Sequence, residues 1–160
     1  MPIEVIEADL SRPEHQRHVL LLTDAYARDP MGGGQPLPPD VADRLVDGLR
    51  AVPNAVVLLA YVEGEPAGIA TCFTAFSTFA AKPLINIHDL AVRPEYRGQG
   101  LSRALLAAVE AKARELGCCK VTLEVIDGNH RARGVYEAAG FVGDYPYSPD
   151  GAVYFLQKKL

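Results

Sequence analysis

The feature that most constrains this chain is the stretch AVRPEYRGQGLSRALL, residues 91–106, in which two glycines join a strand pattern to a helix pattern. Glycine weakens strands and helices alike, so neither element explains Gly98 or Gly100. At a helix start the first backbone N–H groups have no partner, and the helix dipole adds partial positive charge. Glycines let those groups approach phosphate oxygens closely, and Arg97 and Arg103 add charge at the rim. The residues therefore predict a site for a phosphate-bearing ligand.

Two common phosphate-binding loops do not match this corner. A P-loop requires a lysine after its last glycine, whereas Leu101 follows Gly100. The dinucleotide fingerprint G-x-G-x-x-G requires a third glycine where Arg103 stands. These mismatches disfavour a nucleotide-binding domain. A purely structural turn remains the alternative for the glycine pair taken by itself.

The chain around this corner alternates between strand and helix patterns. The turn EGEP at residues 63–66 makes its two flanking strands an antiparallel hairpin, and the strand–helix–strand order around the glycines implies a right-handed crossover between parallel strands. We therefore predict an α/β fold with a mixed sheet, in a single domain over residues 1–160. The predicted strands cover residues 3–9, 55–62, 67–76, 83–92 and 119–126, the helices about 11–28, 40–49, 100–116 and 129–139, and two final strands flank a turn at 149–151.

Composition narrows the class of protein. With 160 residues, 49% of them hydrophobic, the chain can bury a substantial core, and a net charge of −4 without a long basic run argues against nucleic acid and anionic membranes. The apolar segment 51–62 is too short to span a bilayer about 30 Å thick, and residues 1–16 lack a signal-peptide pattern. Cys72, Cys118 and Cys119 show no CxxC spacing and fit thiols in a reducing compartment. We therefore expect a cytoplasmic domain without a metal.

Two motifs carry a resemblance to a known family. The residues that run from Arg97 to Ser102 resemble the signature Arg/Gln-x-x-Gly-x-Gly/Ala of the GNAT acetyltransferase superfamily. The segment NHRARGVYEAAGF, residues 129–141, is similar to the family's Asn-x-x-Ala-x-x-Leu-Tyr-x-x-x-Gly-Phe, with Val135 in the leucine position. Both motifs stand in the family's order with one strand between them. Ser102 departs from the usual Gly or Ala, but serine is nearly as small and its hydroxyl can itself reach a phosphate.

The resemblance implies a fold, a reaction and a cofactor. The fold is the GNAT fold, one three-layer domain whose mostly antiparallel sheet contains a parallel, splayed pair formed by strands 83–92 and 119–126, flanked by helices. The reaction is direct transfer of the acetyl group of acetyl-CoA to a primary amine, without a metal. A bulge parts the splayed strands, and one exposed backbone N–H points at the thioester oxygen. The residues that the resemblance assigns to the cofactor are Leu90, Ala91, Val92, Arg97, Gly98, Gln99, Gly100, Leu101, Ser102, Arg103, Asn129 and Tyr136.

The chemistry also requires an acid and a base. Tyr136 stands at the family's general-acid position and would protonate the leaving thiolate, the alternative being a core aromatic residue. Strand alternation places Asn86, His88, Leu90 and Val92 on one face and Ile85, Ile87, Asp89 and Ala91 on the other. His88 is the preferred base for the attacking amine, because histidine titrates near neutrality. A structural role for His88, a base at Asp89 or Glu124, and a water-mediated route stay open.

The acceptor is expected to be a small primary amine, with a protein N-terminus or lysine as the alternative within the same chemistry and a non-catalytic acyl-CoA-binding module as a second class. The resemblance places the acceptor in a cleft near the first helices. Dimerisation is common in the family, so a homodimer is a possible assembly, but no residue of this sequence establishes it. The candidate lining residues are Tyr26, the loop 31–39, the aromatic segment 73–79, Tyr145 and Tyr147. The glycine run 32–34 is expected to be a flexible loop or a mobile lid over that cleft.

Overall fold

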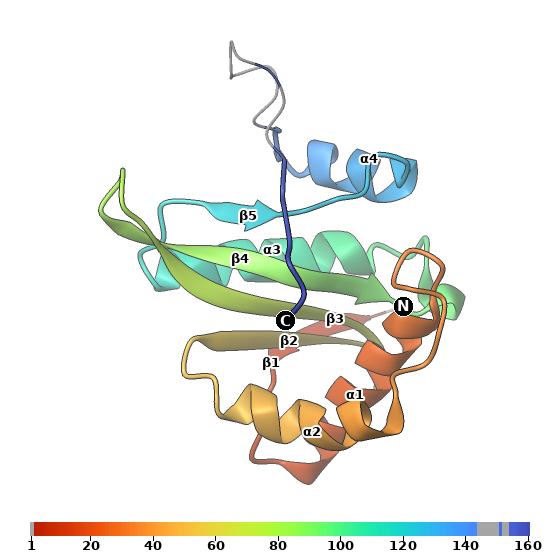
Figure 1. The fold of residues 1–160 in the computed structure, drawn as a ribbon. Helices are drawn as coiled ribbons and strands as arrows, with labels where there is room; N and C mark the ends of the chain where they lie inside the picture. Colours follow the sequence, from red (N-terminus) through yellow and green to blue (C-terminus); the bar gives the residue numbers. More distant parts are fainter. Residues whose placement is uncertain (1, 144–150, 152–153) are drawn as a thin grey trace. The chain divides into compact units, whose positions relative to one another are not determined.

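The computed structural model describes residues 2–143, 151 and 154–160 and divides into two compact units, residues 1–126 and 127–160, which are described separately. The first unit contains a five-stranded sheet with helices on both faces (Figure 1). Its elements are β1 (Ile3–Glu7), α1 (Pro13–Arg28), α2 (Pro39–Arg50), β2 (Ala55–Val62), β3 (Glu65–Ser77), β4 (Lys82–Val92), a 3-10 turn (Pro94–Tyr96), α3 (Leu101–Glu115) and β5 (Val121–Leu123). The second unit contains α4 (His130–Ala138).

The sheet has the strand order β1-β2-β3-β4-β5. The first four strands are antiparallel neighbours, and β5 runs parallel to β4 along Ile85–Ile87 only. A parallel neighbour requires a crossover, which α3 supplies between β4 and β5. The predicted mixed sheet with one parallel pair is therefore confirmed.

Two hydrophobic layers hold the helices on the sheet. On one face, Val19 and Leu22 of α1 pack against a cluster that includes Leu59 of β2 and Ile69 of β3, which are 0% and 1% exposed. On the other face, the fully buried Leu105 of α3 packs against Gly68 of β3. A Cβ added to Gly68 would lie only 3.1 Å from Cδ1 of Leu105. We call these the α1 face and the α3 face.

The predicted element bounds differ from the structure mainly in the last third of the chain. Strand β5 covers three residues rather than 119–126. The predicted final turn lies outside the described residues except for Gly151, and none of the described residues 141–143, 151 and 154–160 belongs to a strand. The single domain over residues 1–160 stays a prediction. Among the helices that the structure describes, none combines the length and the apolar character needed to cross a membrane.

Candidate functional site

A bulge at His88 interrupts the pairing of β4 with β3. Asp89 pairs with Thr71 and Ile87 pairs with Cys72, so His88 has no partner on β3. An extra residue in one strand shifts the alternation of side chains between the two faces. The bulge in β4 begins directly after Ile87, where the pairing of β4 with β5 ends, so the expected separation of these two strands at a bulge agrees with the structure.

The bulge overturns the predicted alternation of β4. Ala91, opposite Ile69, packs with the α1-face core, and Asp89 follows it on the same face by the period of two. Cys72 lies on the same face of β3 as Gly68, which is the α3 face. Ile87 pairs with Cys72 and therefore lies on the α3 face as well. Asp89 and Ala91 therefore do not share a face with Ile85 and Ile87, because the prediction counted His88 as an ordinary strand residue.

The edge of β4 that faces β5 is open beyond the bulge. Pairing with β5 ends at Ile87, and no described residue pairs with the later part of that edge. The N–H of Arg93 donates to Ala67 of β3 at 2.9 Å, so the alternating ladder turns the N–H and C=O groups of Ala91 toward β3 and those of Leu90 and Val92 toward the open edge. Of the three predicted backbone contacts, Leu90 and Val92 face this edge, whereas Ala91 is paired within the sheet.

The glycine corner between β4 and α3 has the geometry of a phosphate cradle. Gly98 and Gly100 have φ angles of +78° and +90°, which L side chains rarely adopt, and a Cβ on either would meet nothing within 4 Å. No side chain caps α3, and within the described part of the chain no protein acceptor is found for the N–H groups of residues 98–103, which include Gln99, Leu101 and Ser102. The space and the unused donors suit a ligand with several acceptor oxygens.

The charges at this corner also favour an anion. Arg103 is exposed in the first turn of α3, where no acidic residue stands, and it forms no ion pair with any described residue. A cation near the positive end of a helix dipole is unfavourable in the helix alone. A bound anion between the N–H groups and Arg103 would reverse that balance.

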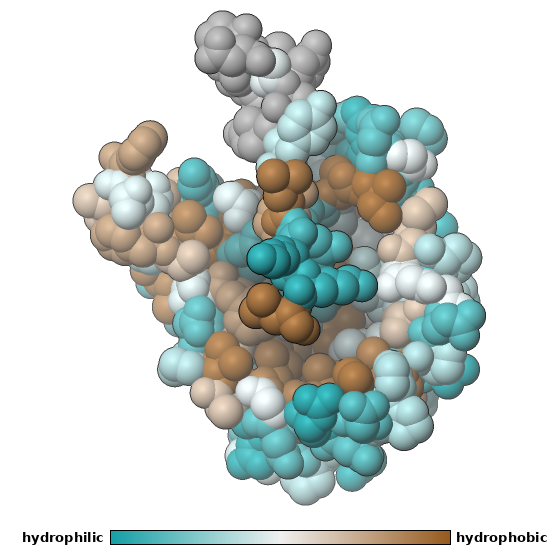
Figure 2. Space-filling model, in the orientation of Figure 1, coloured by the Kyte–Doolittle hydropathy of each residue, from teal (hydrophilic) through white to brown (hydrophobic). Residues whose placement is uncertain are grey.

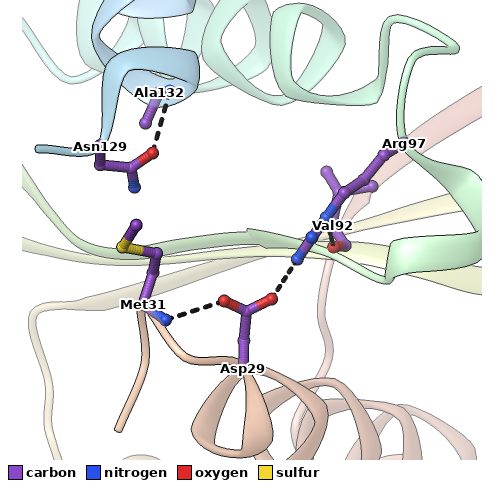
Figure 3. A network of polar contacts seen from close by, with 6 residues as sticks. All are labelled: Asp29, Met31, Val92, Arg97, Asn129 and Ala132. Atoms are coloured by element: carbon purple, nitrogen blue, oxygen red, sulfur yellow. Dashed lines mark hydrogen bonds and ion pairs between the residues drawn. The ribbon is translucent and has the colours of Figure 1, made fainter. Parts of the chain in front are cut away.

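Arg97 extends away from the glycine corner (Figure 3). Its Nε donates to the carbonyl oxygen of Val92 at 3.2 Å, and its Nη2 donates to Oδ2 of Asp29 at 2.5 Å. Asp29 directly follows the last residue of α1, Arg28, and is 68 positions from Arg97 in the sequence. Arg97 was predicted to contact the cofactor, whereas these two donors bind the protein itself.

Asp29 also organises the loop between α1 and α2. Its carboxylate accepts the N–H of Met31 at 2.9 Å, and its carbonyl oxygen accepts the N–H groups of Gly32, Gly33 and Gly34 at 2.8–3.1 Å. An added Cβ on Gly32 would lie 1.9 Å from the carbonyl oxygen of Tyr26, so only glycine fits against the last turn of α1. The glycine run is thus a hydrogen-bonded turn rather than an unrestrained loop.

A pocket lies on the α1 face next to the end of β4. Residues of α1 form one wall, and residues of β4 and of the corner form the other. The pocket is lined by Leu22, Ala25, Tyr26, Ala91, Val92, Arg93, Pro94 and Arg97. Burial raises the pKa of the Tyr26 phenol, and the nearby charges of Asp89 and Asp29 raise it further. The predicted lining residue Tyr26 therefore stands beside Asp89.

The candidate bases differ in their surroundings. His88 is exposed, and its ring lies edge-on to Phe73 with 5.8 Å between centroids. Asp89 is half-buried; burial raises the pKa of its carboxyl, and the charge of His88 opposes that rise. Burial, with a contribution from Asp89, also raises the pKa of Cys72 to about 12. Glu124 is exposed just beyond β5.

Most of the predicted aromatic cleft lies elsewhere. Phe76 and Phe79 are exposed near the tip of the β3–β4 hairpin, at the opposite end of β4 from the glycine corner. The β3–β4 hairpin projects at the left of Figure 2, where tan and white side chains predominate. Tyr145 and Tyr147 fall outside the described residues. Only Phe73 of this aromatic segment stands beside His88.

Two predicted site residues belong to the second unit. Asn129 caps α4, because its Oδ1 accepts the N–H of Ala132 at 3.2 Å. The Tyr136 ring lies 6.0 Å from the Phe141 ring, and the N–H of Phe141 donates to the Tyr136 carbonyl oxygen. Within the first unit, the structure brings together the glycine corner, the open edge, His88 and Asp89. No group of metal-binding side chains is found among the residues that the structure describes.

The role of Asp29 was missed at the level of sequence. An acidic residue at the C-terminal end of a helix opposes the helix dipole, and Asp29 follows the predicted end of α1 at Arg28. An acidic residue at that end of a helix was therefore the signal that the sequence offered. The sequence alone does not reveal which cation neutralises the Asp29 carboxylate.

Known proteins resemble this chain in sequence and in fold. The model of the acetyltransferase (GNAT) family matches residues 20–141. A thialysine N-epsilon-acetyltransferase from Bos taurus is 33% identical over 102 residues, and one from Caenorhabditis elegans is 31% identical over 100 residues. Each match covers 59% of this chain, and 59% and 62% of the respective relatives, so the chain spans about three fifths of their length. The structure of AAC(6')-Iy in complex with the bisubstrate analog CoA-S-monomethyl-acetylneamine has a TM-score of 0.73 at 18% identity, covering 100% of both chains.

The raised pKa of Asp89 predicts how one substitution changes the pH dependence of stability. Its carboxyl binds a proton more tightly in the folded than in the unfolded chain, so stability falls as the pH rises from about 4 through the folded pKa. Asp89→Asn removes that loss. We expect the melting temperature of the variant, relative to the parent protein, to be higher at about pH 8 than at about pH 4, measured by differential scanning fluorimetry.

Asp24→Asn provides a control of opposite sign. A hydrogen bond from Arg28, and a second from the N–H of Leu37, lower the pKa of the Asp24 carboxyl. Its contribution to stability is therefore present above about pH 4 and lost at lower pH. If Asp89→Asn follows the pattern of Asp24→Asn, the burial argument for Asp89 is wrong.

Proposed function

We propose, from the premise that this chain belongs to the acetyltransferase (GNAT) family, that it transfers the acetyl group of acetyl-CoA to the primary amine of a small molecule. The observation that carries the proposal is the glycine corner, whose backbone N–H groups have no described protein acceptor, at the end of a strand with an open edge. A structural turn alone would need the positive φ angles but not the unused donors.

The residues present fit coenzyme A. The N–H groups of residues 98–103 would hold the diphosphate, with Arg103 adding charge. Leu90 and Val92 would bind the pantetheine arm along the open edge of β4, as an added strand is bound. Acetyl-CoA supplies an acetyl thioester whose carbonyl carbon accepts the amine. The backbone N–H of Leu90 is the proposed donor to the carbonyl oxygen, a contact worth about 3 kcal/mol in comparable sites.

His88 is the proposed base that takes the proton of the attacking ammonium. The bulge leaves His88 without a β3 partner, and its ring stands exposed beside Phe73 of the α1 face. Asp89, the next residue, is the alternative, because its carboxyl has a raised pKa. Such a base contributes about 100-fold or more to the rate.

Tyr136 is the proposed acid that protonates the leaving thiolate. A phenol has an ordinary pKa near 10 and is able to donate to a developing thiolate. Asn129 is assigned by the resemblance to the pantetheine arm, and it caps the helix that carries Tyr136. Both roles for Asn129 are compatible, because Asn129 also carries a side-chain NH2 with two donors.

The acceptor is proposed to be a small alkyl amine. Support comes from the similarity to thialysine N-epsilon-acetyltransferases, whose name specifies the side-chain amine of an amino acid as the acceptor. Acetylation of a protein N-terminus or of a protein lysine is the alternative. The cysteines that the structure describes form no disulfide, which suits the proposed cytoplasmic location. The homodimer that is common in the family stays a prediction.

Coenzyme A binding tests the family's cofactor on this chain. We expect coenzyme A and acetyl-CoA to raise the melting temperature, and ATP to leave it unchanged, because ligands that bind only the folded state stabilise it. Gly98→Ala should abolish most of that rise by placing a Cβ in the cradle. Gly64→Ala is the matched control, since Gly64 has a similar φ of +82° and lies in the β2–β3 turn. A rise with ATP alone would refute the proposal.

The pH dependence of kcat/KM distinguishes the candidate bases. His88→Ala should lose the acidic limb of the profile, because that limb reports deprotonation of the base in the free enzyme. Asp89→Asn should keep the limb. The acceptor for this assay is the amine that releases thiol fastest in a panel of thialysine, polyamines, aminoglycosides and peptides. Loss of the limb in Asp89→Asn alone would transfer the role to Asp89.

Tyr136→Phe should lower kcat about 100-fold and change the Kd of coenzyme A by less than about twofold, because the variant loses the proton donor and keeps the aromatic ring. Tyr61→Phe is the control for loss of a structural hydroxyl: Tyr61 Oη forms a hydrogen bond with His18 Nδ1 at 2.8 Å. The control should lower the melting temperature without changing kcat. An unchanged kcat in Tyr136→Phe would remove Tyr136 from the mechanism.

A further inference from the structure

The contact between Asp29 and Arg97 joins two loops that are far apart in the sequence. Arg97 belongs to the glycine corner, and Asp29 begins the loop between α1 and α2. The Asp29 side chain is only 13% exposed and that of Arg97 is 34% exposed, so water screens this pair less than it screens the pairs along the helices. The contact therefore contributes more than an ordinary surface ion pair.

Helix electrostatics explain why these two charges belong together. Asp29 stands at the C-terminal end of α1, where the dipole already places partial negative charge. Arg97 stands just before α3, where the dipole places partial positive charge. Each charge opposes the dipole of its own helix, and the ion pair neutralises both. The pair thus compensates two unfavourable placements at once.

The geometry of Arg97 separates it from the phosphate cradle. Two of its donors are directed to Val92 and to Asp29, and its side chain extends from the corner toward the α1–α2 loop (Figure 3). The cradle itself consists of backbone N–H groups and the exposed Arg103. Loss of the Asp29 contact would therefore release the loop while leaving the cradle in place.

The loop that Asp29 organises borders the small pocket on the α1 face. On the α3 face, Leu105 already crowds Gly68 of β3, which pairs with Val92 at the end of β4. The pocket on the α1 face lies between Tyr26 and the end of β4, and Arg97 lines it. The turn at residues 31–34 packs directly on Tyr26, because Gly32 abuts the Tyr26 carbonyl.

We propose that Asp29 is a positioning residue that acts through Arg97: the pair fixes the turn at residues 31–34 beside the pocket on the α1 face, where the amine would bind, and so sets the affinity for the amine, whereas the diphosphate is held without it. The inference rests on the proposed acetyl transfer. Its consequence is a separation of effects, in which amine binding depends on the pair and coenzyme A binding does not.

Asp29→Asn and Arg97→Lys test the proposal. Asparagine offers one oxygen for two donors, and lysine cannot reach Val92 and Asp29 in the forked geometry of arginine. For both variants we expect the KM of the amine to rise about tenfold, as for loss of one charge-assisted hydrogen bond, and the Kd of coenzyme A, from calorimetry, to change less than twofold. The amine is the fastest in the panel described above. Asp40→Asn, which breaks the exposed pair with Arg44, is the matched control and should change neither constant.

Hydrogen exchange provides a readout that needs no activity. The N–H groups of residues 31–34 all donate to Asp29, so peptides covering this turn should exchange at least about fivefold faster in both variants and at the parent rate in Asp40→Asn. The double variant Asp29→Asn with Arg97→Lys should equal either single variant, since the two residues act as one unit.

Three results would overturn the inference. One is parent-like exchange and KM in Asp29→Asn; another is an equal rise of KM and of the coenzyme A Kd, which marks a general structural defect. The third is a tenfold rise of the coenzyme A Kd in Arg97→Gln with a parent-like Asp29→Asn, which would make Arg97 a phosphate ligand. Failure of the parent protein to bind coenzyme A would instead refute the proposed function, and the exchange data would still decide whether the pair holds the loop.

Discussion

The interaction on which the site depends is the pairing of β4 with β5, and in particular the point at which it stops. Buried backbone N–H and C=O groups require partners, so a strand interior normally has a neighbour on each side. Here the parallel ladder ends at Ile87, directly before the bulge at His88, and β4 continues to Val92 with a described strand partner on β3 only. The carbonyl oxygen of Val92 accepts from Arg97 Nε, so the groups of Leu90 and the N–H of Val92 are suited to a ligand that binds as a strand does.

The end of this pairing also places the other parts of the site. The bulge at His88 shifts which face of the sheet the following side chains occupy. As a result Asp89 lies on the α1 face, near Tyr26 of α1. The same strand then leads through a short turn into the glycine corner, where α3 begins without a side-chain cap. One strand thus carries the candidate base, the backbone donors and the approach to the phosphate cradle in sequence.

The sequence was sufficient for the parts of the site that depend on local backbone chemistry. Gly98 and Gly100 could be assigned because positive φ angles and an uncapped helix start leave a local pattern, and the mixed sheet follows from the order of the elements. The sequence contains a break in the alternation of β4, because two polar residues, His88 and Asp89, follow each other, but only the pairing with Thr71 and Cys72 shows that His88 is the extra residue. The pair of Asp29 with Arg97 is equally invisible, since neither residue specifies its distant partner.

The folding core and the candidate site differ in how well their groups are stabilised by the protein itself. The buried core consists of apolar side chains such as Leu59, Ile69 and Leu105. Three features that oppose stability lie at or beside the open edge of β4: the start of α3 without a side-chain cap, which α1 and α2 also lack, Arg103 against the helix dipole, and the half-buried carboxyl of Asp89. An absent helix cap alone costs about 1 kcal/mol. A bound anion at the corner would offset the uncapped helix start and the charge of Arg103, and a cationic amine near Asp89 would offset the burial of that carboxyl, so three unfavourable placements meet where the proposed ligands would bind.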